Sequence, residues 1–327
     1  MTDRPTAPAE STPQTDATKE EKEPFFTYVD ARQIAMVAVC WLGVRLLPER
    51  RWPWLLSLIG RAAIRLNAQA GRQGAKLIGR LFVDGLPNGE APEALPERIA
   101  TRMVEEPLLW CQLARRPDWR PAMRLEGAEA VDALIGKAGV MLWIAPQPVG
   151  MLLSAIAGHD RGWPLHRLSR EGHGLSSSRF GDRYLNPPVQ RLENRFAERI
   201  IIGAGGSAPA VAAMRAALRA SEVVQVHAVA EAHRLDDFPF LGGTMRLALG
   251  SPKLAVSEDA AVIGVSVERE ADGAFCLRYA TLRTPGEEVA LTEIGRRMAE
   301  HLAAALSRDP AQARLVPSQF PMPERPA

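Results

Sequence analysis

The sequence predicts an α/β protein with a mostly parallel central sheet flanked by helices. Residues 140–145 are six consecutive apolar residues bounded by Gly139 and Pro146, a pattern typical of a strand buried on both faces. Pro146 and Pro148 end this strand, and an apolar helix follows from about residue 151. A β-branched strand at 199–202 followed by a helix repeats the alternation. Strands that alternate with helices indicate a parallel sheet.

Length, charge and cysteine usage narrow the class of protein. The 327 residues suffice for one large domain or two small ones. The net charge of +2 provides no overall basic field, so nucleic acid is not an expected partner. The three cysteines are widely spaced in apolar sequence, which favours reduced structural thiols and a cytoplasmic setting. No Cys/His cluster suggests a metal site.

The N-terminal quarter of the chain is expected to hold a tail and a membrane-associating segment. Residues 1–24 lack large apolar residues and the pattern of a secretory signal, so we expect a disordered tail. Residues 25–85 contain apolar helices at 33–47 and 55–66 and then a basic helix. The first apolar run has about 15 residues, whereas a bilayer span needs roughly 20. Tryptophans and arginines concentrate around the junction of the two helices: Trp41, Arg45, Arg50, Arg51, Trp52 and Trp54. Such residues suit a membrane interface, although both helices could instead pack on the core.

Residues 86–308 form the expected α/β domain, and 309–327 a Pro-rich tail. Hydrophobic periodicity and turn residues set the expected elements. The expected strands lie at 123–127, 140–145, 164–170, 199–202, 223–233, 260–269 and 275–279. The expected helices lie at 97–114, 128–137, 151–157, 210–220 and 292–306.

Two segments carry a resemblance to a known family. The strand and turn at 139–152, and Phe238-Pro239-Phe240-Leu241-Gly242-Gly243, resemble the bacterial lipid A biosynthesis (lauroyl/myristoyl) acyltransferases of the glycerolipid acyltransferase superfamily. With the order of elements, the resemblance spans about residues 33–306. It implies transfer of a fatty acyl chain from an acyl carrier protein or CoA thioester to a lipid or glycolipid acceptor, without a metal or other cofactor. It places the protein at the cytoplasmic face of the bacterial inner membrane, held peripherally or by a single anchor.

The positions that carry catalysis in that family are changed here. The family has a histidine as general base after the proline and an acidic residue five positions later, where this chain has Gln147 and Leu152. If the chain is an enzyme, His227 or His233 would have to act as the base, with Gln147 as an oxyanion donor. Alternation along the strand at 223–233 places both histidines and Glu231 on one face. An ordinary hydrogen-bonded role for His227 remains the alternative.

Substrate contacts are expected from basic and glycine-rich segments. The resemblance implies that a basic stretch handles anionic headgroups, here Arg170, Arg179, Arg183 and Arg199, although arginines on a solvated helix would look the same. It also implies contacts from Phe240 and Gly242. The turn at 203–209 is close to a dinucleotide fingerprint, but no acidic residue ends the next strand, so a phosphate or headgroup contact near Ser207 is preferred. Alternatively, Ser207 simply caps the following helix.

The histidine spacing does not predict a metal site, and the absence of the family's catalytic histidine and acidic residue leaves two functional hypotheses. His159, His166 and His173 recur every seven residues, but the intervening Gly and Pro residues prevent a shared helix face, so a metal site is not expected. The first hypothesis is an acyltransferase with a relocated base. The second is a catalytically inactive relative that binds lipid as a scaffold or regulator, because losing both members of a catalytic dyad without compensation removes nearly all activity.

Overall fold

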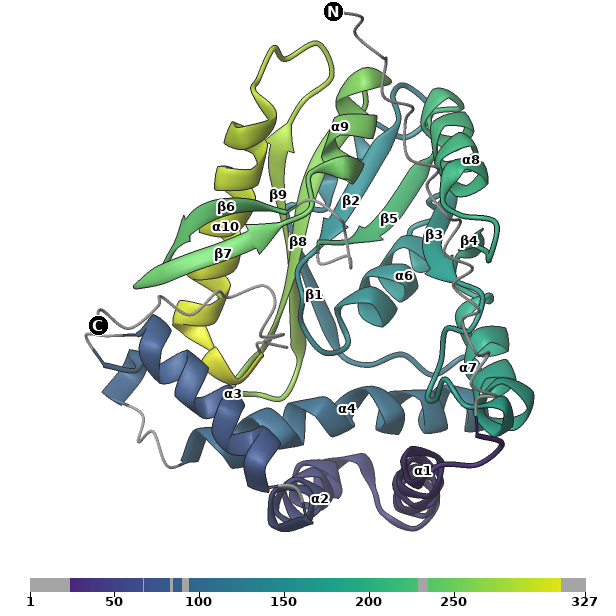
Figure 1. The fold of residues 1–327 in the computed structure, drawn as a ribbon, viewed down its shortest axis with the longest axis vertical. Coiled ribbons are helices and arrows are strands. Elements are labelled where there is room, and N and C mark those ends of the chain that lie inside the picture. The colour runs from purple at the N-terminus through teal and green to yellow at the C-terminus, as the bar shows by residue number, and fades with distance from the viewer. Residues whose placement is uncertain (1–23, 67, 83–84, 90–93, 229–234, 313–327) are drawn as a thin grey trace, which may run out of the picture.

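The computed structural model describes residues 24–66, 68–82, 85–89, 94–228 and 235–312. It confirms an α/β fold with a mostly parallel seven-stranded sheet, in the order β1-β9-β8-β2-β5-β3-β4 (Figure 1). The strands of this sheet are β1 Met123–Glu126, β2 Val140–Ile144, β3 Leu165–Arg170, β4 Glu198–Ile202, β5 Val223–His227, β8 Ala261–Arg269 and β9 Phe275–Arg283.

Strand β2 lies at the centre of the sheet. It pairs in parallel with β5 on one side and with β8 on the other, and all its residues are buried. Strands β3 and β4 continue the parallel arrangement. Strand β9 pairs antiparallel with β8, and β1 pairs in parallel with β9. The expectation of a strand buried on both faces is therefore confirmed, with Trp143 fully buried.

Helices cover both faces of the sheet. On one face, α6 (Gly150–Asp160) and α7 (Asn186–Glu193) supply Leu152, Leu153 and Leu192 to the core. On the other face lie α8 (Ala208–Arg219), α9 (Gly250–Ser257) and α10 (Leu291–Arg308). The helix expected at 128–137 is wrong in length. Only α5 (Glu129–Asp132) is helical, and turns follow it as far as Lys137, with Gly136 at a φ of +71° that favours glycine.

The N-terminal helices form a layer at one end of the sheet. The helices α1 (Tyr28–Leu46), α2 (Trp52–Leu66) and α3 (Ala68–Leu81) pack on α4 (Leu95–Arg115), which crosses beneath the sheet in Figure 1. Cys40, Leu56 and Leu108 meet in a separate apolar cluster there. No described helix is long and apolar enough to span a bilayer. One side of α1 and of α2 packs on α4, as the packing alternative expects, and the other side is exposed.

The edge where the five parallel strands end, here called the carboxyl edge, faces this helical layer. The loop after β3 reaches the start of α1, where the Phe180 N–H donates to the Phe25 carbonyl at 2.8 Å. Nearby, Ser178 Oγ donates to Asp30 Oδ1 at 2.7 Å. At the end of β8, Arg269 Nε lies 3.8 Å from Glu105 Oε1 of α4. Contacts from two separate strands therefore place the carboxyl edge next to the N-terminal helices.

A second, two-stranded sheet was not expected from the sequence. Strands β6 (Asp236–Phe240) and β7 (Gly243–Leu247) form an antiparallel hairpin where a loop was expected. Phe238, Phe240, Met245 and Leu247 are its buried residues, and they pack against α3 and α10. The short 3-10 helix Pro310–Gln312 is also buried, and Asp309 before it pairs with Arg98 and Arg102 of α4. The described chain is packed as far as Gln312.

Candidate functional site

The turn after β2 is built around Gln147, whose side chain binds backbone. Its Nε2 donates to the Val267 carbonyl at 2.9 Å, and the Val267 N–H donates to its Oε1 at 2.7 Å. The amide thus replaces one residue of strand pairing and joins the end of β2 to β8. Gln147 is only 4% exposed. If its side chain were removed, water could therefore not replace these two hydrogen bonds unless the turn rearranged. A role as oxyanion donor would have to use its second N–H.

The next residues of this turn are also held by packing. Leu152, at the family's acidic position, is buried in the core. Val149 has a φ of +58° although it is β-branched, which is a strained conformation for such a residue. It is buried just before α6 begins. Gln147 and Leu152, at the two positions where the resembled family has its catalytic residues, therefore both have structural roles in this chain.

The sheet opens at its carboxyl edge between β3 and β5. Pairing between these strands covers only Leu165–Arg167 with Val223–Gln225. Beyond that point β3 continues with β4 to Arg170, while β5 continues with β2 to His227. The chain then leaves β3 towards β4 and leaves β5 towards β8, in opposite directions along the sheet. Open α/β sheets bind ligands at such points, because the diverging connections leave a crevice.

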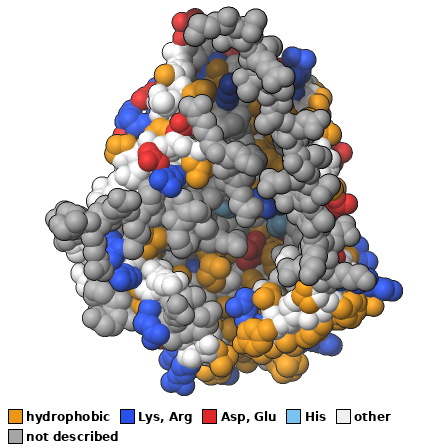
Figure 2. All heavy atoms as spheres, in the orientation of Figure 1, with side chains coloured by type: hydrophobic (Ala, Val, Ile, Leu, Met, Phe, Trp, Pro, Cys, Tyr) orange, Lys and Arg blue, Asp and Glu red, His pale blue; other side chains and the backbone are white. Residues whose placement is uncertain are grey.

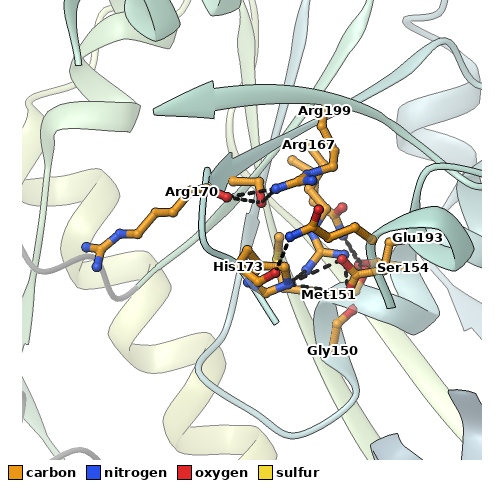
Figure 3. Close-up of polar contacts among 11 residues, drawn as sticks. Gly150, Met151, Ser154, Arg167, Arg170, His173, Glu193 and Arg199 are labelled. Atoms are coloured by element: carbon orange, nitrogen blue, oxygen red, sulfur yellow. Dashed lines mark hydrogen bonds and ion pairs between the residues drawn. The ribbon is translucent and has the colours of Figure 1, made fainter. Parts of the chain in front are cut away.

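Polar side chains line the last paired row of this opening. Arg199 of β4, Arg167 of β3 and Gln225 of β5 are aligned in register across three strands. Gln225 Nε2 donates to the Met151 carbonyl at 2.8 Å and to the Ser154 hydroxyl, which joins β5 to α6 (Figure 3). Neighbouring like charges on adjacent strands repel each other. Burial and the charge of Arg167 both lower the pKa of Arg199, although Glu193 acts in the opposite direction.

Glu193, at the end of α7, compensates this positive charge. Its carboxylate is 2% exposed, and Oε1 lies 2.9 Å from Arg167 Nη1. The His173 imidazole is the second neighbour, with Nε2 3.2 Å from Glu193 Oε2. Burial raises the pKa of Glu193, but the hydrogen bond from His173 and the charges of Arg167 and His173 bring it below the usual range. The carboxylate is therefore ionised near neutral pH.

The loop that carries His173 is fixed by side-chain hydrogen bonds. The fully buried Asn186 accepts from the Leu175 N–H at 2.7 Å and donates to the Ser176 carbonyl at 2.7 Å. Gln190 Nε2 donates to the His173 carbonyl at 2.6 Å. A Cβ on Gly174 would lie 2.3 Å from Asn186 Oδ1, so glycine is required there. The backbone around His173 is thus held in place from α7.

The three acidic or imidazole candidates on the strand at 223–233 are only partly described. His227 is half-buried at the end of β5, in register with Ile144 of β2, and alternation places it on the face of Gln225. The Ala228 N–H donates to the Ile144 carbonyl at 2.7 Å, so β5 still pairs at this point. Glu231 and His233 lie outside the described residues. The structure thus places His227 at the carboxyl edge.

The expected substrate residues do not form one group. The Arg170 side chain points away from the polar cluster in Figure 3, while its carbonyl accepts from Arg199 at 2.7 Å. Arg179 and Arg183 are exposed on the loop that reaches α1. Ser207 is the N-cap residue of α8, but its hydroxyl makes no capping hydrogen bond.

Phe240 and Gly242 belong to the hairpin on the opposite face of the sheet from Gln225. Phe240 is buried in the core cluster of that face. The Gly242 N–H donates to the Leu81 carbonyl at the end of α3, at 2.8 Å. The family-like block at 238–243 therefore packs the hairpin onto the helical layer.

An exposed apolar surface lies on the helical layer. Of the fifteen large apolar side chains that are exposed in the described chain, twelve belong to residues 25–66, so the apolar exposure is concentrated on α1, α2 and the segment before them. Leu42, Leu46 and Trp54 are 55%, 74% and 59% exposed. Exposed arginines accompany them: Arg32, Arg45, Arg50, Arg51, Arg61 and Arg65. Figure 2 shows hydrophobic side chains along this lower edge, with Lys and Arg beside them.

The expected membrane-facing role of Trp52 is wrong. Its side chain is 8% exposed and packs against Trp119, with ring centroids 5.7 Å apart. It faces α4 because it is on the side of α2 that also carries Leu55 and Leu56. Trp41 and Trp54 remain exposed on this surface.

Sequence reasoning missed Arg167, Glu193, Gln225 and Ser154. Gln225 carried a signal, because it is a polar residue in a mostly apolar strand, and such residues are buried only with partners. Arg167 carried a weaker one, because alternation in β3 places it on the same side as Leu165. Glu193 carried none, since it sits in a polar helix and its partners are distant in sequence. Within the described ranges, no group of three or more His, Cys, Asp and Glu side chains could hold a metal ion.

Replacing Gln147 should test its structural role. We expect Gln147→Ala to lower the free energy of unfolding by about 1–3 kcal/mol, because the Val267 N–H and carbonyl lose buried partners. Gln147→Glu should be at least as damaging, since a carboxylate oxygen would face the Val267 carbonyl. Urea denaturation measures both. The exposed Gln73 on α3 provides the control Gln73→Ala, which should leave stability unchanged, and equal stability of all three variants would rule out the role assigned to Gln147.

No protein-family model matches the sequence, and no curated protein resembles it at a significant level. The family resemblance therefore rests on the residues of the two segments and on the order of the elements. The function of the site has to be inferred from its side chains and from the surface next to it.

Proposed function

We propose that this protein is a peripheral lipid acyltransferase, which moves a fatty acyl chain from an acyl carrier protein or CoA thioester to a lipid or glycolipid acceptor at the cytoplasmic face of the inner membrane. The observation that carries the proposal is the position of the exposed apolar surface. It lies at the same end of the molecule as the carboxyl edge of the sheet. A lipid acceptor held in the bilayer surface would meet the polar groups at that edge.

The charges around this surface suit an anionic membrane. Arginines surround the exposed leucines and tryptophans of α1 and α2, and Asp30, an acidic residue of α1, is buried. Cationic side chains beside apolar ones add electrostatic attraction to insertion, and each contributes roughly 1 kcal/mol on an anionic leaflet. Arg179 and Arg183 extend the basic surface towards the carboxyl edge, where a phosphate of the acceptor or donor would be bound.

Acyl transfer from a thioester needs a base for the acceptor and donors for the oxyanion. The carboxyl edge offers two described histidines, His173 and His227. Backbone N–H groups at the start of α6 point towards the same edge and would suit developing negative charge. The resemblance of the β2–α6 turn to the acyltransferase family supports this class of reaction over others.

One observation favours a second candidate, a catalytically inactive lipid-binding relative. The two family positions that carry catalysis are occupied by Gln147, whose amide pairs with Val267, and by Leu152, which is part of the core. A chain selected only to bind lipid would keep the apolar surface and lose the dyad in this way. The two candidates differ in whether acylated lipid is formed.

Substitutions on the exposed surface should test membrane binding. Deleting α1 and α2 would uncover the apolar face of α4, so we prefer the triple variant Leu42→Ser, Leu46→Ser, Trp54→Ser. Each removes apolar area that would leave water on insertion, at roughly 25 cal/mol per Å². We expect binding to phosphatidylglycerol vesicles to fall by at least about tenfold in co-sedimentation. Ile201→Ser, at an exposed residue of β4, is the control, and equal binding by triple variant and control would reject the surface.

Lipid analysis should decide between the two functional candidates. We expect mass spectrometry of a deletion strain to show the loss of an acylated lipid, with the less acylated precursor in its place. Complementation with the wild-type chain should restore the product. A deletion strain whose lipids match those of the parent would leave only the lipid-binding candidate.

A further inference from the structure

We propose that His173, oriented by the buried carboxylate of Glu193, is the general base of this reaction. The assignment rests on the acyltransferase function proposed above. It moves the base away from the β2–α6 turn, and also away from His227, to the loop that follows β3.

The surroundings of Nε2 fix the tautomer of the imidazole. Nε2 lies 3.2 Å from Glu193 Oε2 and 3.2 Å from Arg167 Nη2. Arginine can only donate, so Nε2 cannot donate to Glu193 and accept from Arg167 at once. With the proton on Nε2, the imidazole donates to the Glu193 carboxylate, whose Oε1 also lies 2.9 Å from Arg167 Nη1. The other tautomer would remove one donor from this buried carboxylate, which is unfavourable.

This tautomer leaves Nδ1 as the nitrogen that can accept a proton. No described residue hydrogen-bonds to Nδ1, and the His173 side chain is 35% exposed, whereas that of Glu193 is 1% exposed. A buried carboxylate that accepts from one imidazole nitrogen orients the ring and stabilises the imidazolium that forms. Arg167 holds the carboxylate ionised and in place, so Glu193 is a positioning residue and takes no proton.

Other described histidines with carboxylate neighbours lack this combination. His166 Nε2 lies 2.7 Å from Glu222, but both residues are at the amino ends of their strands, opposite the carboxyl edge. His159 lies at the end of α6 and pairs with Asp160, whose side chain is 36% exposed. Among these three histidines, only His173 combines a buried carboxylate with a place at the carboxyl edge.

The loop also connects the base to the membrane surface. Five residues after His173, Ser178 Oγ donates to the buried Asp30 of α1 at 2.7 Å. Phe180 then contacts the rings of Phe25 and Phe26, with centroids 5.9 and 5.1 Å away, and both phenylalanines are about half exposed. The loop therefore joins His173 to the end of the molecule where an acceptor headgroup would meet the exposed apolar surface.

The reaction step balances with this base. The acceptor oxygen (or nitrogen) attacks the thioester carbonyl, and its proton moves to His173 Nδ1. The carbonyl is restored as the carbon–sulfur bond breaks, and the proton passes from Nδ1 to the leaving thiolate. An ester or amide and a free thiol are formed, with no change of oxidation state. General base catalysis of this kind contributes about 10²–10⁴-fold.

Initial-rate assays of variants should test the assignment. Membranes of the deletion strain supply the acceptor, and a saturated acyl thioester of CoA or acyl carrier protein supplies the donor. We expect His173→Ala and His173→Gln to transfer about 10²–10⁴-fold more slowly than wild type. The Gln variant keeps a donor towards Glu193, so its melting temperature and vesicle binding should match wild type. The control is His159→Ala, which should keep full activity.

Glu193 needs a readout that separates positioning from folding. Glu193→Gln removes the charge beside Arg167, so the charge-conserving Glu193→Asp accompanies it. We expect Glu193→Asp to recover part of the rate that Glu193→Gln loses. The wild-type rate should fall at acid pH, and the residual activity of His173→Gln should lack that dependence.

The outcomes separate the two proposals. If the wild-type chain forms no acylated product with either donor, the proposed function fails and the assignment fails with it. If wild type is active and folded His173→Gln is equally active, only the assignment is overturned. Loss of activity in His227→Ala together with full activity in His173→Gln would give the role of base to His227 instead.

Discussion

The ionised carboxylate of Glu193 is the constraint on which the carboxyl edge depends. Two arginines, Arg167 and Arg199, stand side by side on β3 and β4, and Arg167 is 5% exposed. A buried charge whose partner is removed typically destabilises a fold by about 3–5 kcal/mol. Glu193 prevents this by binding Arg167, and its carboxylate also contacts the His173 imidazole. The same carboxylate therefore stabilises the sheet edge and orients an accessible imidazole.

A second buried carboxylate connects this edge to the helical layer. Asp30 forms a capping box with Thr27 at the start of α1 and accepts from Ser178 of the loop after β3. Burial raises the pKa of Asp30, but hydrogen bonds from Ser176, Ser178 and Thr27 outweigh it and lower the pKa to about 2. Because the folded-state pKa is lowered, the connection persists at neutral pH and weakens only as the pH falls towards that value. The exposed surface of α1 and the loop of His173 are thus coupled.

Local patterns in the sequence predicted much of the fold, because they reflect local physics. The apolar run at 140–145 became β2, and apolar periodicity located α1, α2, α4 and α10 within a few residues. The hairpin at 236–247 was missed because Pro239 and the glycines indicate a loop, whereas its stability comes from packing of Phe238 and Phe240 on distant helices. The exposed side of α2 was predicted only in part, since helix periodicity did not show that Trp52 would face Trp119.

The candidate site was harder to predict because its contacts are long-range. The histidines at 159, 166 and 173 share no helix face, as predicted, but the prediction did not identify His173 as a site residue. Its partner Glu193 lies 20 residues later, at the end of α7, and Arg167 comes from the preceding strand β3. Which strands neighbour each other decides that Arg199, Arg167 and Gln225 align. A single sequence does not reveal that order.

The central claim is that the carboxyl edge and the apolar helical surface act together at a membrane. Hydrogen–deuterium exchange of the full-length protein, with and without phosphatidylglycerol vesicles, tests it most directly. We predict slower exchange in α1, in α2 and in the loop at 171–180 when vesicles are present. The amides of α8 and β4, which lie away from that surface, should exchange as before (Figure 1). Protection confined to α8 and β4, or no change anywhere, would contradict this account.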